Sequence, residues 1–569
     1  MGERKTYIIN IDGMRADYFS TMGHQGCLTP TLVSLANQGM FFTNCKSTMP
    51  ANTGTNHVAI LTSTHAGSHG ILGIGGYYQG LDLDHFRFSR KYGTAKANMY
   101  NHNHLQMSTY FNIIKSQNPS LITAFITGKT WLGGIIPDED CDITVYPGNN
   151  SDNSGNHLPN PSYVTSSEGY VLGGFAHPED NEIFPRVYIP GKDETESEAP
   201  PGVISLAPVD FDADKLPSDK WIIDQAIHCV DYDNPDFMYM VLMNMDLAGH
   251  GYGSSLVEQT SDEIDTKNLN VLRNPNAIQD QLFLTDLEVK RFIEHLKNKN
   301  LYNDARIIIT SDHGMNTMKT LFSGETKKNI VDWVLERIDI IKAEDRYETF
   351  ISPIFDETLD IDIREILAQH EIHMRASPDK FLERYNPDGD YDWCISEGPN
   401  AYIFNAEPDI QNRIKDILTQ HTIEENGNTV NPVWKILTAD EQNDEINDYT
   451  GDKFKLGKGD YQDVIWPSVI IFLKPHYMVP MYHDQLMSGL MPIMIKLKLP
   501  GFIDIRTATG AHGTYLEQDV PLILVSKNES VVPPGVVVED QVSVLDIIPT
   551  ISHLNGWSIS PSFEGESLV

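Results

Sequence analysis

Residues 49–57 are Met49-Pro50-Ala51-Asn52-Thr53-Gly54-Thr55-Asn56-His57. A strand-like run, Phe41-Phe42-Thr43-Asn44, precedes this stretch, and an apolar run, Val58-Ala59-Ile60-Leu61, follows it. The pattern predicts that Thr53 lies where a strand gives way to a buried helix. Backbone N–H groups at the start of a helix lack partners and favour an anion. Two roles are open to Thr53: its hydroxyl caps the helix, as threonine often does, or it faces an anionic ligand.

The rest of the chain alternates strand-like and helical patterns. This alternation, with strands apolar on both faces, predicts an α/β fold with a central mostly parallel sheet and helices on both faces. The expected strands are 7–11, 41–44, 121–126, 237–243, 305–310 and 521–525. The expected helices are about 31–37, 104–117, 220–229, 279–298 and 543–554, the last strand and helix forming a closing βα unit.

Two long stretches break this rhythm. Residues 132–220 are rich in Gly, Pro, Asn, Asp and Ser, which predicts a long loop excursion over the active face. Residues 315–500 mix short strands and amphipathic helices, which predicts an inserted cap or substrate subdomain. The catalytic α/β core is therefore expected to comprise residues 1–314 and 501–569.

Composition narrows the class of protein. The 569 residues are 40% hydrophobic and 9% aromatic, as in a soluble globular protein. We find no apolar run near the roughly 20 residues that span a bilayer, and no secretory signal before the first strand. We therefore expect a soluble protein without a membrane span, cytoplasmic or secreted with its signal removed. The oligomeric state is not indicated.

Charge restricts the partners. The chain has 79 acidic and 42 basic residues, a net charge of −37. This argues against binding of a nucleic-acid polymer or an anionic membrane, since both favour a basic face. A site for a small anionic substrate would need local positive charge, for which metal ions are the best source. The five cysteines are scattered and form no CxxC pair, so neither a disulfide scaffold nor a thiolate zinc site is expected.

Acidic and histidine side chains follow several of the predicted strands. In an open parallel sheet, ligands bind beyond the carboxyl ends of the strands. Each such residue alone is compatible with a turn or a cap. Together they supply three carboxylates and three imidazoles, which suit zinc or a similar metal and suffice for two ions. The six residues are Asp12, Asp246, His250, Asp312, His313 and His512.

Thr53 is the candidate nucleophile at such a metal centre. Two metal ions about 4 Å apart form a clamp for in-line phosphoryl transfer. An unactivated threonine hydroxyl is a poor nucleophile, and metal coordination is one way to activate it. The set therefore predicts a hydrolase of phosphoric esters.

These residues also give the chain a resemblance to the alkaline phosphatase superfamily, closest to its type I phosphodiesterase/nucleotide pyrophosphatase branch. The matching pieces, in the family's order, are residues 9–13, 49–62, 67–71, 246–253, 311–315, 510–513, 544–551 and 563–568. The resemblance implies that Asp12, Thr53, Asp312 and His313 hold one zinc ion, and that Asp246, His250 and His512 hold the other. It also implies that Thr53 attacks phosphorus to give a phosphothreonine, while the N–H of Gly54 holds a phosphate oxygen.

The chain departs from that branch at one phosphate contact. An asparagine is expected shortly after residues 69–71, but residues 71–76 contain none, and Ile74 stands near its place. Lys129, after the strand 121–126, resembles a lysine of phosphonoacetate hydrolases and some monoesterases, although it is also compatible with a surface turn. A lysine there favours a doubly charged group. The alternative functions are therefore a phosphomonoesterase or a phosphonoacetate-hydrolase-like enzyme and, third, a non-catalytic binding protein, against which the full metal-site set argues.

Overall fold

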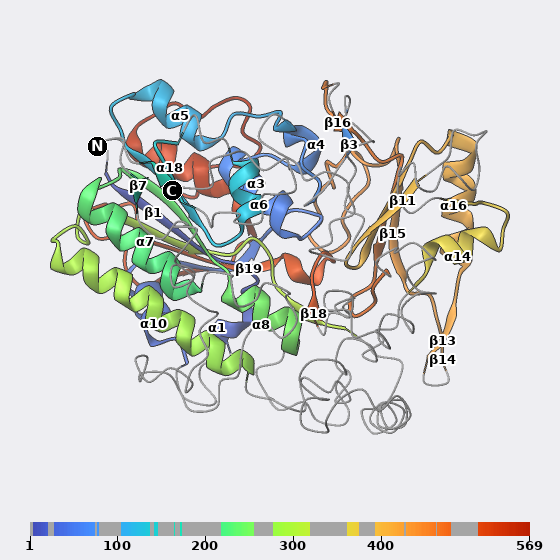
Figure 1. Cartoon of the computed structure of the whole chain (residues 1–569), viewed down its shortest axis with the longest axis horizontal. Helices are drawn as coiled ribbons and strands as arrows, with labels where there is room; N and C mark the ends of the chain where they lie inside the picture. The colour runs from blue at the N-terminus through green and yellow to red at the C-terminus, as the bar shows by residue number, and fades with distance from the viewer. Residues whose placement is uncertain are drawn as a thin grey trace.

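A computed structural model gives the architecture of the chain (Figure 1). The structure describes residues 4–20, 28–73, 77–78, 104–136, 141–145, 164–165, 171–172, 218–254, 277–318, 361–374, 393–425, 428–461, 464–479 and 510–569. Most of the predicted excursion of residues 132–220 thus lies outside the described residues.

A nine-stranded sheet forms the centre of the molecule, with strand order β20-β2-β19-β9-β1-β8-β4-β5 and with β21 paired to β2. The strands are β1 (Thr6–Ile11), β2 (Met40–Lys46), β4 (Thr123–Thr127), β5 (Ile143–Val145), β8 (Phe237–Leu242), β9 (Arg306–Thr310), β19 (Asp519–Ser526), β20 (Val536–Val538) and β21 (Val542–Ser543). The five strands β9, β1, β8, β4 and β5 are mutually parallel, which confirms the predicted α/β class.

Strand β19, which belongs to the predicted closing βα unit, runs against the parallel strands. It pairs antiparallel with both β9 and β2. Its apolar run reads the same in either direction, so the pattern could not reveal its orientation. Because β19 starts where the parallel strands end, the segment before it reaches their carboxyl edge.

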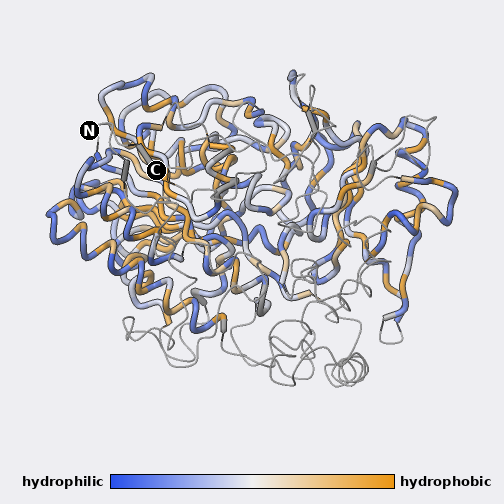
Figure 2. The backbone as a smooth tube through the Cα atoms, in the orientation of Figure 1, coloured by the Kyte–Doolittle hydropathy of each residue, from blue (hydrophilic) through white to orange (hydrophobic). Residues whose placement is uncertain are grey.

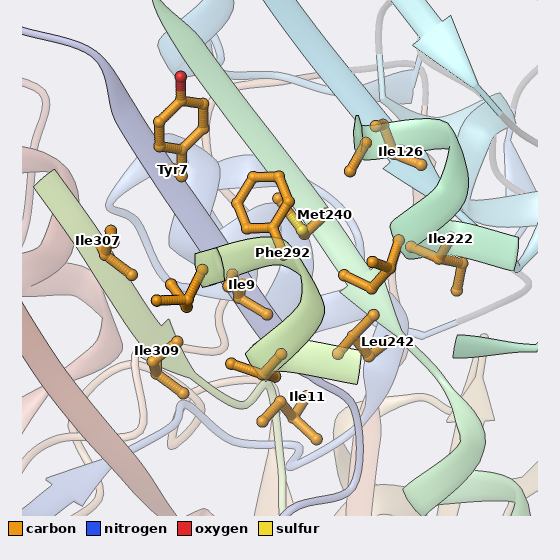
Figure 3. Close-up of a cluster of buried hydrophobic side chains, with 14 of the residues drawn as sticks. Tyr7, Ile9, Ile11, Ile126, Ile222, Met240, Leu242, Phe292, Ile307 and Ile309 are labelled. Atoms are coloured by element: carbon orange, nitrogen blue, oxygen red, sulfur yellow. The ribbon is translucent and has the colours of Figure 1, made fainter. Parts of the chain in front are cut away.

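Helices cover both faces of this sheet (Figure 1). Alternate residues of β1 face opposite sides, as the pleat of a strand requires. Tyr7, Ile9 and Ile11 pack with α2 (Pro30–Gln38), α7 (Asp219–Tyr232) and α10 (Ala277–Asn298), as Figure 3 shows in part. Ile8 belongs to the opposite core, with α3 (Thr53–Thr62), α5 (Tyr110–Gln117) and α18 (Ile547–Asn555). The strands are consequently apolar along most of their length (Figure 2).

Two helices begin later than predicted because side chains cap them. Helix α5 begins at Tyr110 rather than near residue 104, since Thr109 and Asn112 form a capping box. Before α18, Ser543 and Asp546 form another, and a 3₁₀ turn, η7 (Val544–Asp546), precedes the helix.

A second, smaller sheet lies within the predicted insertion of residues 315–500. Its order is β11-β12-β17-β15, all antiparallel, with β11 (Trp393–Glu397), β12 (Asn400–Phe404), β15 (Val433–Thr438) and β17 (Val469–Leu473). Helices α14 (Ile363–Ala368) and α16 (Pro408–Gln420) supply residues to its apolar core. Figure 1 shows this unit beside the large sheet.

The remaining elements are short. They are α1 (Asp17–Ser20), α4 (Ala66–His69), β3 (Tyr77–Tyr78), α6 (Thr130–Ile135), β6 (Val164–Thr165), β7 (Val171–Leu172), α8 (Asn244–Tyr252), β10 (Asn316–Thr317), β13 (Ile423–Glu425), β14 (Asn428–Val430), β16 (Val464–Ile465), β18 (Gly510–Ala511) and η6 (Leu516–Gln518). Of the helices in the described ranges, none combines the length and apolar character needed to cross a membrane.

Candidate active site

The start of α3 presents Thr53 at the carboxyl edge of the sheet. Asn52 caps this helix, because its side-chain oxygen accepts the N–H of Thr55 at 3.1 Å. Thr53 is therefore the first helical residue and not the cap, which excludes the first of the two roles considered above. Among the described residues, no acceptor is found for the N–H groups of Thr53 and Gly54. These two donors are available to an anion.

Four adjacent parallel strands bring the predicted residues to this edge. Asp12 follows β1, Asp246 lies in the first turn of α8 after β8, and Asp312 and His313 follow β9. Lys129 follows β4, the next strand along. Since β9, β1, β8 and β4 are neighbours in the sheet, residues far apart in sequence meet at one place.

Gly13 lets two of these strand ends approach. It has φ +77°, and a Cβ placed there would lie 2.8 Å from the Cα of Asp246. Any larger residue would be strained and would push Asp246 away.

The first potential ligand group is formed by Asp12, Asp312 and His313. Their ligand atoms all lie within 4.8 Å of one another, and all three side chains are fully buried. Asp12 Oδ1 and Asp312 Oδ2 have no hydrogen-bond partner in the described part of the chain. Buried carboxylate oxygens without partners are costly, so this donor set fits a bound cation. Thr53 Oγ1 lies 3.0 Å from His313 Nε2, beside the group.

The second group is formed by Asp246, His313 and His512, whose ligand atoms also lie within 4.8 Å of one another. His250 Nε2 lies 3.4 Å from Asp246 Oδ1, on the same carboxylate. His313 is thus near both groups, and its ring stacks on that of His512 with centroids 3.6 Å apart. Asp246 Oδ1 is another buried oxygen for which the described residues offer no hydrogen-bond partner.

Three histidines of the candidate site place the same ring nitrogen, Nδ1, against the backbone. In each, Nδ1 lies near a backbone carbonyl oxygen. The distance is 2.9 Å from His250 to Gly510 and 2.7 Å from His313 to Gly314. It is 3.2 Å from His512 to Ala51. A carbonyl only accepts, so each Nδ1 carries the proton and donates it. This leaves the Nε2 lone pair directed at the carboxylates, which is the arrangement that metal-binding histidines use.

Lys129 lies inside the site and not on the surface. Its Nζ is 2.5 Å from Asp12 Oδ2, 2.8 Å from Asp246 Oδ2 and 3.4 Å from Thr53 Oγ1. Burial alone would lower the pKa of Lys129, but the carboxylates outweigh it and raise that pKa, so the ammonium stays charged. Likewise, burial alone would raise the pKa of Asp246, but Lys129 and the neighbouring histidines hold it well below its usual range.

Two further features were not recognised as part of the site from the sequence. His57, one helical turn after Thr53, is fully buried, and its Nε2 lies 3.4 Å from Asp312 Oδ2. The i,i+4 spacing to Thr53 on an apolar helix was its only signal. The expected asparagine position near Ile74 lies outside the described residues, but the carboxylate of Glu397, on β11, packs directly against Gly73.

The turn between β11 and β12 also reaches the second ligand group. A Cβ at Gly398, which has φ +59°, would lie 3.1 Å from the carbonyl oxygen of His512. A Cβ at Gly513 would lie 2.6 Å from Asn400 Nδ2. The smaller sheet therefore packs against the segment that carries His512.

The family model and the curated relative both describe nucleotide pyrophosphatases and phosphodiesterases. A model of the family described as type I phosphodiesterase / nucleotide pyrophosphatase matches residues 6–418. Ectonucleotide pyrophosphatase/phosphodiesterase family member 1 of Rattus norvegicus is 36% identical over 67 residues, which is 12% of this chain and 7% of that protein. The match thus spans only a small part of this relative.

Solved structures share the fold at 13% identity. Murine ectonucleotide pyrophosphatase / phosphodiesterase 5 has a TM-score of 0.50, with 98% of this chain and 96% of that chain covered. A structure of its inactive threonine-to-alanine variant is a complex with AMP. The alkaline phosphatase PafA has a TM-score of 0.55, with 100% of this chain and 99% of that chain covered.

Proposed function

The chain belongs to the type I phosphodiesterase/nucleotide pyrophosphatase family of phosphoric ester hydrolases, and we propose that it cleaves its substrate at two metal ions with Thr53 as the nucleophile. The observation that carries this proposal is the position of the Thr53 hydroxyl. It lies 3.0 Å from His313 Nε2, beside two carboxylate–histidine groups, at a helix N-terminus whose first two N–H groups have no acceptor in the described part of the chain.

The residues present fit divalent metal ions. Three carboxylate oxygens that lack hydrogen-bond partners in the described ranges face three imidazoles whose Nε2 lone pairs are directed at them. Asp12, Asp312, His313 and Thr53 would hold one ion, and Asp246, His250 and His512 the other. Zinc suits this mixture of nitrogen and oxygen donors. When bound, the ions supply a lowered pKa for a hydroxyl and charge neutralisation at the phosphoryl group.

The side chains divide the reaction between them. Thr53 Oγ forms a bond to phosphorus as the bond to the leaving alcohol oxygen breaks, and the product is a phosphothreonine. Water then attacks phosphorus, which restores the Thr53 hydroxyl and releases the phosphate product. The free N–H of Gly54 holds a non-bridging oxygen, as a helix N-terminus does for anions.

The family description favours a diester or a pyrophosphate as the substrate, and the AMP complex of the murine relative is consistent with a nucleotide. Lys129 favours the second candidate, a phosphate monoester or a phosphonate. Its ammonium is buried 3.4 Å from Thr53 Oγ1, where it would face the extra negative charge of such a group. Rates on a dinucleotide analogue, an aryl monoester and phosphonoacetate would separate the two candidates.

Replacement of the nucleophile tests the mechanism. We expect Thr53→Ala to lower kcat by at least about 10³-fold, since residues that form covalent intermediates have effects of this size or larger. Bound zinc, measured by metal analysis, should remain largely in place. Thr55→Ala is the matched control, because Thr55 is also fully buried in the first turn of α3 and lies outside both ligand groups. Unchanged turnover in Thr53→Ala would refute the mechanism.

A further inference from the structure

His57 lies beneath the first ligand group, in a layer that neither the ligands nor the nucleophile occupy. It comes four residues after Thr53 on α3, so it is on the same face of the helix, one turn deeper. Its Nε2 lies 3.4 Å from Asp312 Oδ2 and 3.7 Å from Asp12 Oδ2. The side chain has no exposed surface.

Tyr239, on β8, contacts the other side of the His57 ring. Its hydroxyl oxygen lies 2.7 Å from His57 Nδ1, and the two rings meet edge to face. Two proton arrangements are possible for this pair. Either the phenol donates to Nδ1 and the imidazole proton sits on Nε2, or Nδ1–H donates to the phenol oxygen and Nε2 carries a lone pair.

The carboxylates decide between these arrangements. In the second arrangement, the Nε2 lone pair would face two carboxylate oxygens inside the protein and repel them. In the first, Nε2–H faces those oxygens at 3.4 and 3.7 Å. It makes no hydrogen bond within the described residues, but its positive charge density still lowers the cost of burying the carboxylates. The geometry therefore places the proton of His57 on Nε2.

The ring proton of His57 is therefore on the opposite nitrogen from that of the three histidines near the ligand groups. His250, His313 and His512 have Nδ1 against a backbone carbonyl, so their Nε2 is free to bind a metal ion. His57 has Nδ1 against a hydroxyl that can donate, so its ring proton sits on Nε2. His57 is thus suited to hold a carboxylate and unsuited to bind a metal through Nε2.

We propose that His57, oriented by Tyr239, is a positioning residue that holds the Asp312 and Asp12 carboxylates in the orientation their role as metal ligands requires. This inference rests on the proposed metal centre and deepens it. It assigns His57 and Tyr239 to the function of the site, although neither touches the phosphoryl group in the proposed reaction.

The direct test measures the affinity of the metal-depleted protein for Zn²⁺ by competition with a chelator. Partners that orient metal ligands are typically worth about 10–100-fold in affinity or activity, so we expect His57→Ala to weaken Zn²⁺ binding by that factor. His57→Gln should recover most of the loss, because its amide N–H₂ can occupy the place of Nε2–H. Tyr239→Phe should weaken binding less, in the same direction.

Controls separate positioning from general packing. His69→Gln alters another fully buried histidine, one that accepts the N–H of Ile71 at 3.2 Å and lies outside both ligand groups, so Zn²⁺ affinity should be unchanged. Wild-type Zn²⁺ affinity in all His57 and Tyr239 variants, even with lower thermal stability, would overturn the inference. If His57→Ala does not fold, His57→Gln and Tyr239→Phe still decide it. The proposed function fails by different results, namely active Thr53→Ala or wild-type protein that binds no Zn²⁺.

Discussion

At the scale of single residues, the site depends on the division of tasks between Asn52 and Thr53. Asn52 caps α3 through its bond to the Thr55 N–H, so the Thr53 side chain is not used by the helix. The Thr53 hydroxyl can instead contact His313 and Lys129. A cap residue directly before the nucleophile therefore fixes the helix and leaves the nucleophile free to react.

Lys129 should influence the choice of substrate. A monoester carries more negative charge than a diester, so losing a buried cation should affect the monoester more. We expect Lys129→Ala to lower kcat/KM for an aryl monoester by about 10²-fold or more, as other losses of charge-stabilising groups do, and to affect a diester less. Steady-state rates on the two substrates check this. Lys220→Ala, at an exposed lysine on α7, should change neither rate. Equal losses on both substrates would contradict the assigned role.

At the scale of elements, the tail after α18 is held by one carboxylate. Glu564 accepts from Ser68 and pairs with His65, both near α4, and lies 3.5 Å from Lys455 Nζ. The Glu564 N–H also donates to Ser63 O at 2.7 Å, just after α3. The tail thus links α4 to the end of α3, the helix that begins at the nucleophile.

The stabilisation that Glu564 gives to the tail should depend on pH. Burial alone would raise the pKa of Glu564, but His65, Ser68 and Lys455 outweigh it and lower the pKa from 4.5 to about 2. A carboxylate with a lowered folded-state pKa stabilises the fold above its unfolded pKa, and this contribution is lost as pH falls through the folded value. We expect Glu564→Gln to reduce the free energy of unfolding by about 1–3 kcal/mol at neutral pH.

Denaturant unfolding at several pH values measures this contribution. The difference between Glu564→Gln and wild type should shrink as pH falls from about 4.5 towards 2. Glu566→Gln, at an exposed neighbour, should match wild type throughout. A difference that stays constant with pH would show that the charge of Glu564 is not what holds the tail.

The proximity of the candidate ligands could be predicted from the sequence more closely than the bounds of the elements around them. Asp12, Asp246 and Asp312 could be placed together because residues after parallel strands must share one edge. The contact between His57 and Tyr239 could not be predicted from the sequence. It joins a residue of α3 to a residue of β8, and only the folded sheet brings these two elements together. The start of α5 was mispredicted because a capping box sets it, and the direction of β19 could not be predicted from its apolar pattern.

At the scale of the whole molecule, the β11–β12 turn of the smaller sheet packs against the segment that carries His512, a residue of the second ligand group. The close approach of Gly398 to His512 O connects the β11–β12 turn to a candidate metal ligand. The inserted unit should therefore influence catalysis through the position of His512.

A pair of glycines tests this connection. Gly398 (φ +59°) and Gly451 (φ +82°) both have conformations that strain an alanine, but only Gly398 has a neighbour within 4 Å. Both alanine variants should lose roughly 1 kcal/mol of stability from backbone strain. Gly398→Ala alone should also lower kcat/KM, by about tenfold for a loss of 1.4 kcal/mol in transition-state binding. Equal kcat/KM in the two variants would show that the turn does not position His512.

The antiparallel strand β19 also has a consequence for the order in which the protein matures during synthesis. It lies between β2 and β9, inside the sheet, and the segment before it carries His512. The ribosome makes β2 and β9 long before β19, so a gap stays open in the nascent sheet until residues 519–526 have emerged. The last candidate ligand thus arrives together with the strand that closes the core. Nascent chains stalled before residue 512 should therefore hold neither a closed sheet nor a complete second ligand group.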